Sequence, residues 1–511
     1  MRVPLTVNDF LERAALVYGE RIGIVDEPEQ PAESLGALKY REVYELARAQ
    51  AAALDDLGIG PGERIAVVSQ NSARLLLAFF GVSGWGRVLV PINFRLNAEE
   101  VAYIVEHSGA RMLLVDPELD DDLRSVPAEH RFVLGTQSDE VIYHHGAEPS
   151  RWEANEDATA TVNYTSGTTA RPKGVQLTHR NLWINAATFG WQLGVCDHDV
   201  YLHTLPMFHC NGWGMPYAFT GMGARHVVLR KVDGAEILRR IDEHGVTALN
   251  GAPTVVNSVI DAAREWQGDV PGRSRVRITV AGAPPPTRTI EEVETVLGWE
   301  FVQVYGLTET APLLVMNRRR AEYDELTPAA RAKKLIRAGA PALAVRIAVD
   351  DEGEILAASN VVMDGYWEQP EESATAIRDG WFHTGDGGWL DEESYLTISD
   401  RKKDVIITGG ENVSSIEVED CLCSHPAVAE AAVIGVPDEK WGETVKALVV
   451  LTPGAQVSEA DLIEHCREHL AHYKCPTTVE VRVELARTTT GKLQKFKLRE
   501  PYWAGRDRQI G

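Results

Sequence analysis

The segment YTSGTTARPKG, residues 164–174, decides how the rest of the chain is interpreted. It contains an unbroken run of hydroxyl-bearing residues and glycine from Thr165 to Thr169, and Lys173 follows. Glycine lets the backbone approach an anion closely, and successive N–H groups and hydroxyls can surround phosphate oxygens while a lysine balances their charge. The segment lacks the GxxxxGK[ST] spacing of a Walker A loop. It therefore predicts a phosphate-binding loop of another kind.

Strand-like and helix-like patterns alternate on the N-terminal side of this segment. The pattern predicts buried strands over residues 64–69, 87–91 and 111–115, and helices over residues 72–80 and 98–108. Such alternation is typical of parallel sheets that are covered by helices.

The pattern changes near the C-terminal end, after the polar turn DRKKD at residues 400–404. A helix is predicted to begin within residues 416–421, followed by strands over 428–436 and 445–451 and an amphipathic helix over 458–470.

These two patterns predict a two-domain chain of α/β plus α+β class. Residues 1–402 are expected to form a large N-terminal domain of helix-covered parallel sheets. Residues 403–511 are expected to form a small C-terminal α+β domain.

Composition excludes several classes of function. The chain has 511 residues, with 51 basic and 75 acidic side chains and a net charge of −24, which argues against a nucleic-acid partner and against an anionic membrane surface. Asp9 and Glu12 lie where a signal peptide would be apolar. The six cysteines show neither a CxxC pair nor zinc-like spacing, as is typical of buried thiols in a reducing compartment. We therefore expect a cytoplasmic protein without membrane partners.

The phosphate-loop segment resembles that of the adenylate-forming superfamily, which comprises acyl-CoA synthetases, peptide-synthetase adenylation domains and luciferases. Further signatures of this superfamily follow in order: LPMFHCNGW (205–213), VAGAPPP (280–286), VYGLTET (304–310), WFHTGD (381–386), DRKKDVIITGGENV (400–413) and TTTGK (488–492). Within the superfamily, the chain is most similar to the acyl-CoA ligase branch that contains methylmercaptopropionate–CoA ligases and plant acyl-activating enzymes.

The resemblance implies an ATP site. Tyr305 and the wall formed by residues 282–284 would enclose adenine, and Asp386 would accept the ribose hydroxyls. A single carboxylate, Glu309, is suited to Mg²⁺, which prefers few protein ligands in addition to ATP phosphates. The complete set of implied ATP contacts is Thr165, Ser166, Gly167, Thr168, Thr169, Lys173, Gly282, Ala283, Pro284, Tyr305, Gly306, Thr308, Asp386, Arg401 and Lys492.

The implied catalytic group consists of Lys492, Thr165, Glu309 and His209. Lys492 matches the mobile lysine that stabilises charge as a carboxylate attacks the α-phosphate. His209 either lines the channel between the phosphate loop and the acyl pocket or is a satisfied core residue. Lys403 matches the hinge about which the small domain rotates between the two half-reactions.

The resemblance places Asn211, Trp213, Ala281 and Ala311 around the acyl group, with Trp213 capping a short pocket. The expected activity is ATP- and Mg²⁺-dependent activation of a small or aromatic carboxylic acid as an acyl-adenylate, with pyrophosphate release and transfer to CoA. Two alternatives remain open at this point. One is a diazotase that activates nitrite for N–N bond formation on an aminoaryl acid, and the other is a catalytically silent binding protein with the same fold.

Overall fold

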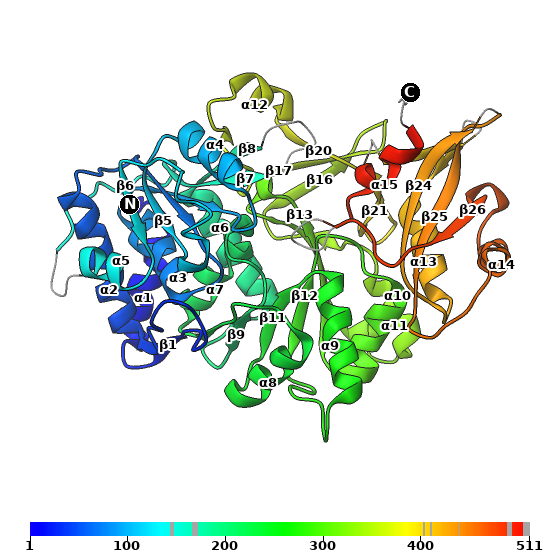
Figure 1. Cartoon of the computed structure of the whole chain (residues 1–511), viewed down its shortest axis with the longest axis horizontal. Helices are drawn as coiled ribbons and strands as arrows, with labels where there is room; N and C mark the ends of the chain where they lie inside the picture. Colours follow the sequence, from blue (N-terminus) through cyan, green and yellow to red (C-terminus); the bar gives the residue numbers. More distant parts are fainter. Residues whose placement is uncertain are drawn as a thin grey trace.

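The computed structural model describes residues 1–143, 148–165, 172–401, 404–408, 411–438, 440–487 and 493–503. Figure 1 shows a large body that contains the N-terminal part of the chain and a smaller body, coloured orange to red, formed by the C-terminal part. Three sheets belong to the large body and one sheet belongs to the small body.

The first sheet has seven strands and carries the predicted phosphate loop. Its order is β18 (Gly365–Tyr366), β8 (Lys173–Thr178), β7 (Thr159–Thr165), β4 (Val88–Ile92), β3 (Arg64–Val68), β5 (Ala110–Val115) and β6 (His130–Val133). The five strands from β7 to β6 are parallel, whereas β8 and β18 are antiparallel additions at one edge. Residues 65–68 are all buried, as expected for a parallel strand covered on both faces.

The second sheet has nine strands. Its order is β15 (Ala340–Pro341), β14 (Leu313–Asn317), β13 (Glu300–Gly306), β12 (Arg277–Val280), β11 (Ala248–Gly251), β9 (Val200–His203), β10 (Arg225–Val228), β1 (Ile22–Val25) and β2 (Ala37–Lys39). The strands from β13 to β1 are parallel, and the antiparallel pairs lie at the two edges.

Helices pack against both sheets. They are α1 (Asn8–Tyr18), α2 (Tyr40–Asp56), α3 (Ala73–Gly81), α4 (Ala98–Ser108), α5 (Thr136–Ile142), α6 (His179–Leu193), α7 (Met215–Met222), α8 (Gly234–His244), α9 (Pro253–Glu265), α10 (Thr287–Glu292), α11 (Pro328–Leu335) and α12 (Pro370–Ala376). Every residue of α3 is buried, and its apolar side chains share one continuous core with residues of β8 and β13. This core joins the two sheets.

The third sheet is antiparallel and was not anticipated by the prediction of parallel sheets. It comprises β16 (Val345–Val349), β17 (Glu354–Ser359), β20 (Trp381–Leu390) and β19 (Ile377–Arg378), with β21 (Leu396–Arg401) paired to β20. These strands are short or closely spaced, so their sequence patterns did not distinguish them from loops.

The small body is an α+β unit with its own apolar core. It contains β22 (Ile406–Thr408), β23 (Glu411–Val413), β24 (Val428–Asp438), β25 (Gly442–Leu451) and β26 (Thr478–Val481), together with α13 (Ser415–Ser424), α14 (Glu459–His469) and α15 (Lys495–Trp503). The predicted fold class is confirmed. The division at residues 402 and 403 stays a prediction, because both residues lie outside the described part of the chain.

No helix in the described ranges has the length and hydropathy needed to span a bilayer.

Candidate active site

The hairpin of β7 and β8 holds the two ends of the predicted phosphate loop. Its register pairs Thr165, the last residue of β7, with Lys173, the first residue of β8. A Cβ on the neighbouring Gly174 would lie only 2.9 Å from a methyl carbon of Val162, so this close strand packing requires glycine. Two predicted phosphate contacts therefore lie side by side at one end of the sheet. Four others lie outside the described residues: Ser166, Gly167, Thr168 and Thr169.

Tyr366 connects this hairpin to the predicted magnesium ligand. The Nζ atom of Lys173 lies 4.8 Å from the centroid of the Tyr366 ring, a favourable cation–π geometry. The Tyr366 hydroxyl donates a hydrogen bond to Oε1 of Glu309 at 3.0 Å. Burial, and then the negative charge of Glu309, raise the pKa of Tyr366. The phenol therefore stays neutral, and its O–H donates a hydrogen bond to the carboxylate.

The backbone around Glu309 is fixed from two directions. A short 3₁₀ turn, Thr308–Thr310, follows the end of β13. The N–H of Met363 donates to the Glu309 carbonyl oxygen at 2.8 Å. A Cβ on Gly306 would collide with the carbonyl oxygen of Pro312, so only glycine permits this close approach. Glu309 is thereby held where its carboxylate meets the hydroxyl of Tyr366, whose ring contacts Lys173.

Tyr305 and Asp386, the predicted adenine and ribose contacts, meet directly. The Tyr305 hydroxyl donates to Oδ2 of Asp386 at 2.9 Å. The backbone N–H of Asp386 donates to Oγ1 of Thr384 at 3.1 Å, which fixes the Asp386 backbone on β20. The β20–β21 register pairs Asp386 with Arg401, whose side chain lies outside the described part of the chain.

The predicted adenine wall lies beside Tyr305. β12 and β13 are parallel neighbours with Val280 paired to Gln303, so the segments that follow them leave the same edge of the sheet. Gly282, Ala283 and Pro284 follow β12 directly, and Gly282 is exposed with φ +97°. Ligands of open α/β sheets bind at this edge, beyond the carboxyl ends of the strands.

The segment that contains His209 has an unusual backbone. Residues 210–213 all have positive φ between 45° and 61°, a left-handed turn that costs roughly 1–2 kcal/mol for each non-glycine residue. Half-buried His209 begins this segment, and the Cys210 thiol lies 4.0 Å from the Thr308 carbonyl oxygen. Strain of this kind is retained where the surrounding contacts over-determine it, often at functional sites.

Asn211 anchors the left-handed turn from within the protein. Its amide nitrogen donates to Oγ1 of Thr161 at 2.9 Å, and the Asn163 amide donates to its oxygen at 3.0 Å. Asn211 has no exposed surface. Both polar ends of its amide thus hold the turn against β7, and the predicted contact of Asn211 with the acyl group stays a prediction.

The other predicted acyl-pocket residues differ in exposure. Ala311 is fully buried, Trp213 is 5% exposed and shares the main core, and Ala281 is half-buried. Contact of these residues with a substrate stays a prediction. The predicted hinge Lys403 and the predicted mobile lysine Lys492 lie outside the described residues.

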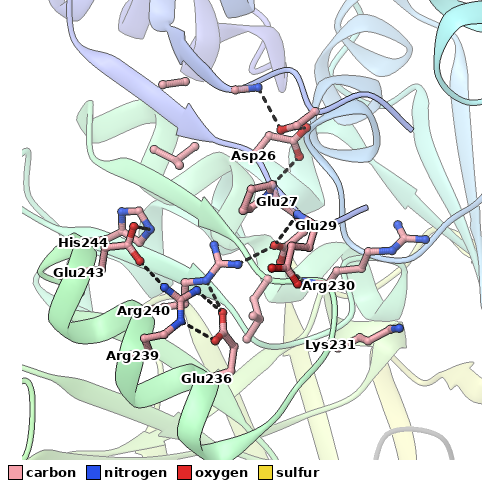
Figure 2. A pocket seen from close by; sticks show the side chains of 16 residues that line it. Asp26, Glu27, Glu29, Arg230, Lys231, Glu236, Arg239, Arg240, Glu243 and His244 are labelled. Carbon is pink, nitrogen blue, oxygen red and sulfur yellow. Dashed lines mark hydrogen bonds and ion pairs between the residues drawn. The ribbon is translucent and has the colours of Figure 1, made fainter. Parts of the chain in front are cut away.

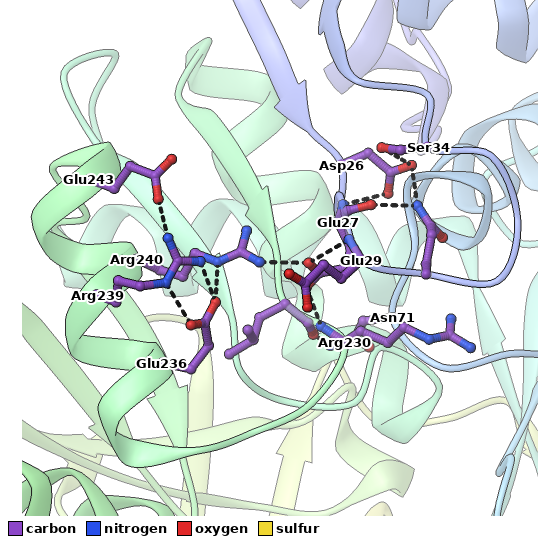
Figure 3. Close-up of polar contacts among 12 residues, drawn as sticks. Asp26, Glu27, Glu29, Ser34, Asn71, Arg230, Glu236, Arg239, Arg240 and Glu243 are labelled. Atoms are coloured by element: carbon purple, nitrogen blue, oxygen red, sulfur yellow. Dashed lines mark hydrogen bonds and ion pairs between the residues drawn. The ribbon is translucent and has the colours of Figure 1, made fainter.

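A cavity of 610 Å³ lies elsewhere, between α8 and the segment that follows β1 (Figure 2). We call it the α8 pocket; none of the predicted site residues lines it. Several of its charged side chains pair with one another, as Figure 3 shows for Arg239, Arg240 and Glu236. Hydrogen bonding to Arg239 is the main cause that lowers the pKa of Glu236 to about 2.

Comparisons with known proteins agree with this geometry. The model of the AMP-binding enzyme family matches residues 11–367, and the model of the AMP-binding enzyme C-terminal domain matches residues 417–492. A 2-methylpropanoate–CoA ligase of Humulus lupulus is 36% identical over 97% of this chain and 95% of its own length.

Solved structures are similar over nearly the whole chain. The anthranilate CoA ligase AuaEII in complex with anthranoyl-AMP has a TM-score of 0.87 and 27% identity, covering 98% of this chain and 99% of that one. The O-succinylbenzoate CoA synthetase of Bacillus subtilis in complex with ATP and a magnesium ion has a TM-score of 0.81 and 30% identity, covering 96% and 99%.

The two-part fold, the β7–β8 hairpin with Thr165 beside Lys173, and the contact of Tyr305 with Asp386 are those of a two-domain enzyme that binds an adenine nucleotide. The chain belongs to the AMP-binding enzyme family. Within that family it is an AMP-forming ligase.

Sequence reasoning missed Tyr366. Its contacts with Lys173 and Glu309 arise from the pairing of β18 with β8, which joins segments about 190 residues apart. The local sequence offers little to identify Tyr366: it follows Gly365 in a two-residue strand for which no strand was predicted.

Proposed function

We propose that this ligase activates a small or aromatic carboxylic acid with ATP and transfers the acyl group to CoA. The observation that carries the proposal is the row formed by Lys173, Tyr366 and Glu309 at the end of the β7–β8 hairpin. A cation and a carboxylate held this close are suited to the phosphates of ATP and to a divalent ion.

In the first half-reaction, an oxygen of the substrate carboxylate attacks the α-phosphorus of ATP, and the bond to pyrophosphate breaks. Lys173 and the hydroxyl of Thr165 would bind phosphate oxygens, while Tyr305 and Asp386 would position adenosine. Glu309, with its donor Tyr366, is the carboxylate that would hold Mg²⁺, and the ion would supply charge neutralisation to the phosphates. Lys492 would stabilise the negative charge that develops during the attack.

In the second half-reaction, the CoA thiol, having lost its proton, attacks the acyl carbon of the adenylate, and AMP leaves. Rotation of the small domain about Lys403 would withdraw Lys492 and bring residues 408–410 to the acyl group. The 2-methylpropanoate and anthranilate ligases named above are acid–CoA ligases, which favours acid activation over the nitrite activation of a diazotase.

The size of the acid is proposed from Trp213 and from relatives named for short-chain and aromatic acids. All six cysteines are free thiols, which supports a reducing compartment such as the cytoplasm.

The test is release of AMP and pyrophosphate with a panel of carboxylic acids, with and without CoA, and in parallel with nitrite and an aminoaryl acid. We expect AMP release that requires an acid and CoA, with a thioester product. AMP release that requires nitrite and an amine, and is indifferent to CoA, would overturn the proposal.

Lys492→Ala separates the chemical step from nucleotide binding. We expect adenylate formation to be nearly abolished while ATP binding, measured by calorimetry, is largely retained. Adenylate formation at the wild-type rate in this variant would remove Lys492 from the mechanism.

A further inference from the structure

A group of potential metal ligands lies in the C-terminal body, apart from the nucleotide site. Cys421 on α13 and His465 and His469 on α14 each offer one ligand atom, and these atoms all lie within 4.8 Å of one another. Zinc binds sulfur at about 2.3 Å and nitrogen at about 2.0–2.1 Å, so two ligand atoms on one ion lie roughly 3–4 Å apart. Small side-chain rotations are enough to bring these three atoms onto one ion.

We propose that Cys421, His465 and His469 form a Zn²⁺ site that braces α13 against α14. The ligand set is one thiol and two imidazoles, which suits zinc and not the oxygen-seeking Mg²⁺ that accompanies ATP. This site goes beyond the ligase activity and does not depend on it.

Backbone carbonyl groups already orient both imidazoles. Nε2 of His465 lies 3.1 Å from the carbonyl oxygen of Cys421, and Nδ1 of His469 lies 2.7 Å from the carbonyl oxygen of His465. A ring nitrogen facing a carbonyl oxygen must carry the proton, so the other nitrogen of each ring carries the lone pair. Imidazole ligands of protein-bound metals are commonly held in this way.

The surroundings of Cys421 supply a second thiol. Cys421 is 8% exposed, and Cys466, which is fully buried on α14, belongs to the same apolar core. His465 and His469 lie on the same face of α14 because they are four residues apart, and their ring centroids are separated by 4.5 Å. One helix thus presents two nitrogens and a neighbouring sulfur to the thiol of the other helix.

The position of α13 gives such a site a mechanical consequence. Asp420, which precedes Cys421, accepts hydrogen bonds from the N–H and hydroxyl of Thr287 at the start of α10, at 2.8 and 3.0 Å. An ion at Cys421 would therefore stiffen the helix through which the small body contacts the large one. We expect it to stabilise the small body without entering the reaction.

This site could not be predicted from the sequence, because its ligands are far apart along the chain. His465 and His469 have the spacing of a helical metal-binding pair, but Cys421 lies 44 residues before His465. Only the packing of α13 on α14 brings the thiol to the imidazoles.

The test uses the full-length, reduced protein, stripped of metal with a chelator and freed of nucleotide. We expect it to take up one equivalent of Zn²⁺, to show the absorption of a thiolate-bound tetrahedral ion when Co²⁺ is used as the probe, and to unfold at a higher temperature with Zn²⁺ present. His469→Gln and Cys421→Ser should weaken Zn²⁺ binding by more than about a hundredfold, since a lost ligand matters more than a lost orienting partner. Because His469 is exposed, its replacement should leave the fold intact.

Two matched controls keep the result specific. Cys423→Ser changes another buried cysteine of α13, and His472→Gln changes an exposed histidine close to α14; both should bind Zn²⁺ as the wild type does. Glu309→Gln should also bind normally, which separates this site from the metal of the nucleotide site.

Equal Zn²⁺ affinity in the wild type, Cys421→Ser and His469→Gln would overturn the proposal. A Cys421–Cys466 disulfide found by mass spectrometry in the protein purified without reductant, with no Zn²⁺ uptake after reduction, would overturn it as well. Neither measurement uses ATP or an acid, so failure here leaves the ligase assignment untouched.

Discussion

The nucleotide site and the α8 pocket both contain carboxylates, but they hold them in different ways. In the α8 pocket, Glu236 lies between two guanidinium groups, those of Arg239 at 2.7 Å and Arg240 at 2.6 Å. At the nucleotide site, Glu309 accepts a hydrogen bond from the neutral hydroxyl of Tyr366. A guanidinium neutralises a carboxylate, whereas a phenol orients it without removing its charge.

The α8 pocket thus pairs its carboxylates with guanidinium groups, and at the nucleotide site tyrosine hydroxyls orient the carboxylates. The pairs of the α8 pocket satisfy one another and join α8 to the segment after β1 (Figure 3). Glu309 and Asp386 are each oriented by a tyrosine hydroxyl, an arrangement suited to receiving a cation or sugar hydroxyls. A cavity by itself is therefore a poor guide to the chemistry of this molecule.

The largest expected effect comes from removing the charge at the nucleotide site. Glu309→Gln should lower kcat/KM for adenylate formation by roughly a hundredfold or more, because a metal-neutralised phosphate charge is worth several kcal/mol in the transition state. Pyrophosphate release at saturating acid is the measurement.

Glu236→Gln is the matched control in the α8 pocket. It makes the same chemical change beside two arginines, and turnover should stay within about twofold of the wild type, as for a surface substitution outside the site. Equal losses of activity in Glu309→Gln and Glu236→Gln would contradict the view that only the carboxylate of the nucleotide site takes part in the reaction.

Tyr366→Phe sharpens the comparison by removing only the hydroxyl. The ring stays beneath Lys173, but Glu309 loses a donor, and hydrogen bonds to charged groups contribute about 1.5–3 kcal/mol. We expect the KM for Mg·ATP to rise roughly tenfold to a hundredfold, measured at several Mg²⁺ concentrations. Tyr366→Leu removes the ring as well; a loss confined to that variant would show that the ring matters and the hydroxyl does not.

Asn211→Ala tests whether the left-handed turn at residues 210–213 is held in place by the hydrogen bonds of Asn211 to β7. The change removes the two hydrogen bonds that Asn211 makes with Thr161 and Asn163, which keep only their bond to each other at 2.9 Å and a long contact of Asn163 with the Phe208 carbonyl at 3.5 Å. Each lost hydrogen bond contributes about 1 kcal/mol. We expect the free energy of unfolding in urea to fall by about 2 kcal/mol, with KM for the acid rising more than KM for ATP. A rise in KM for the acid with unchanged stability would instead support direct contact of Asn211 with the acyl group.

The sequence predicted those elements that local patterns control. The helix expected over residues 98–108 coincides with α4, because Asn97 caps its first N–H groups and Gly109 ends it in a left-handed conformation. The strand expected over 111–115 is β5 with one further residue. Local capping and unbroken apolar runs leave little freedom in such elements.

Long-range pairing accounts for what the sequence did not predict. The contact of Tyr366 with Glu309 depends on an edge strand of two residues, and the hydrogen bonds of Asn211 depend on packing against β7. Ligand motifs indicated which residue types gather at the site. They could not indicate whether each side chain faces the ligand or the core.

The smallest effect expected concerns pH and the α8 pocket. Hydrogen bonds from Arg239 and then Arg240, together with the charges of both guanidinium groups, lower the pKa of Glu236 from 4.5 to about 2. A carboxyl group whose pKa is depressed by folding stabilises the native state above its unfolded pKa, and this stabilisation is lost as the pH falls toward the folded value. The Glu236 side chain is 29% exposed, so solvent screening limits the contribution to about 1 kcal/mol. In urea titrations, wild type and Glu236→Gln should therefore differ in stability near neutral pH and converge as the pH falls from 4.5 toward 2. A difference that stays constant across that interval would mean that Glu236 acts through packing and not through its charge.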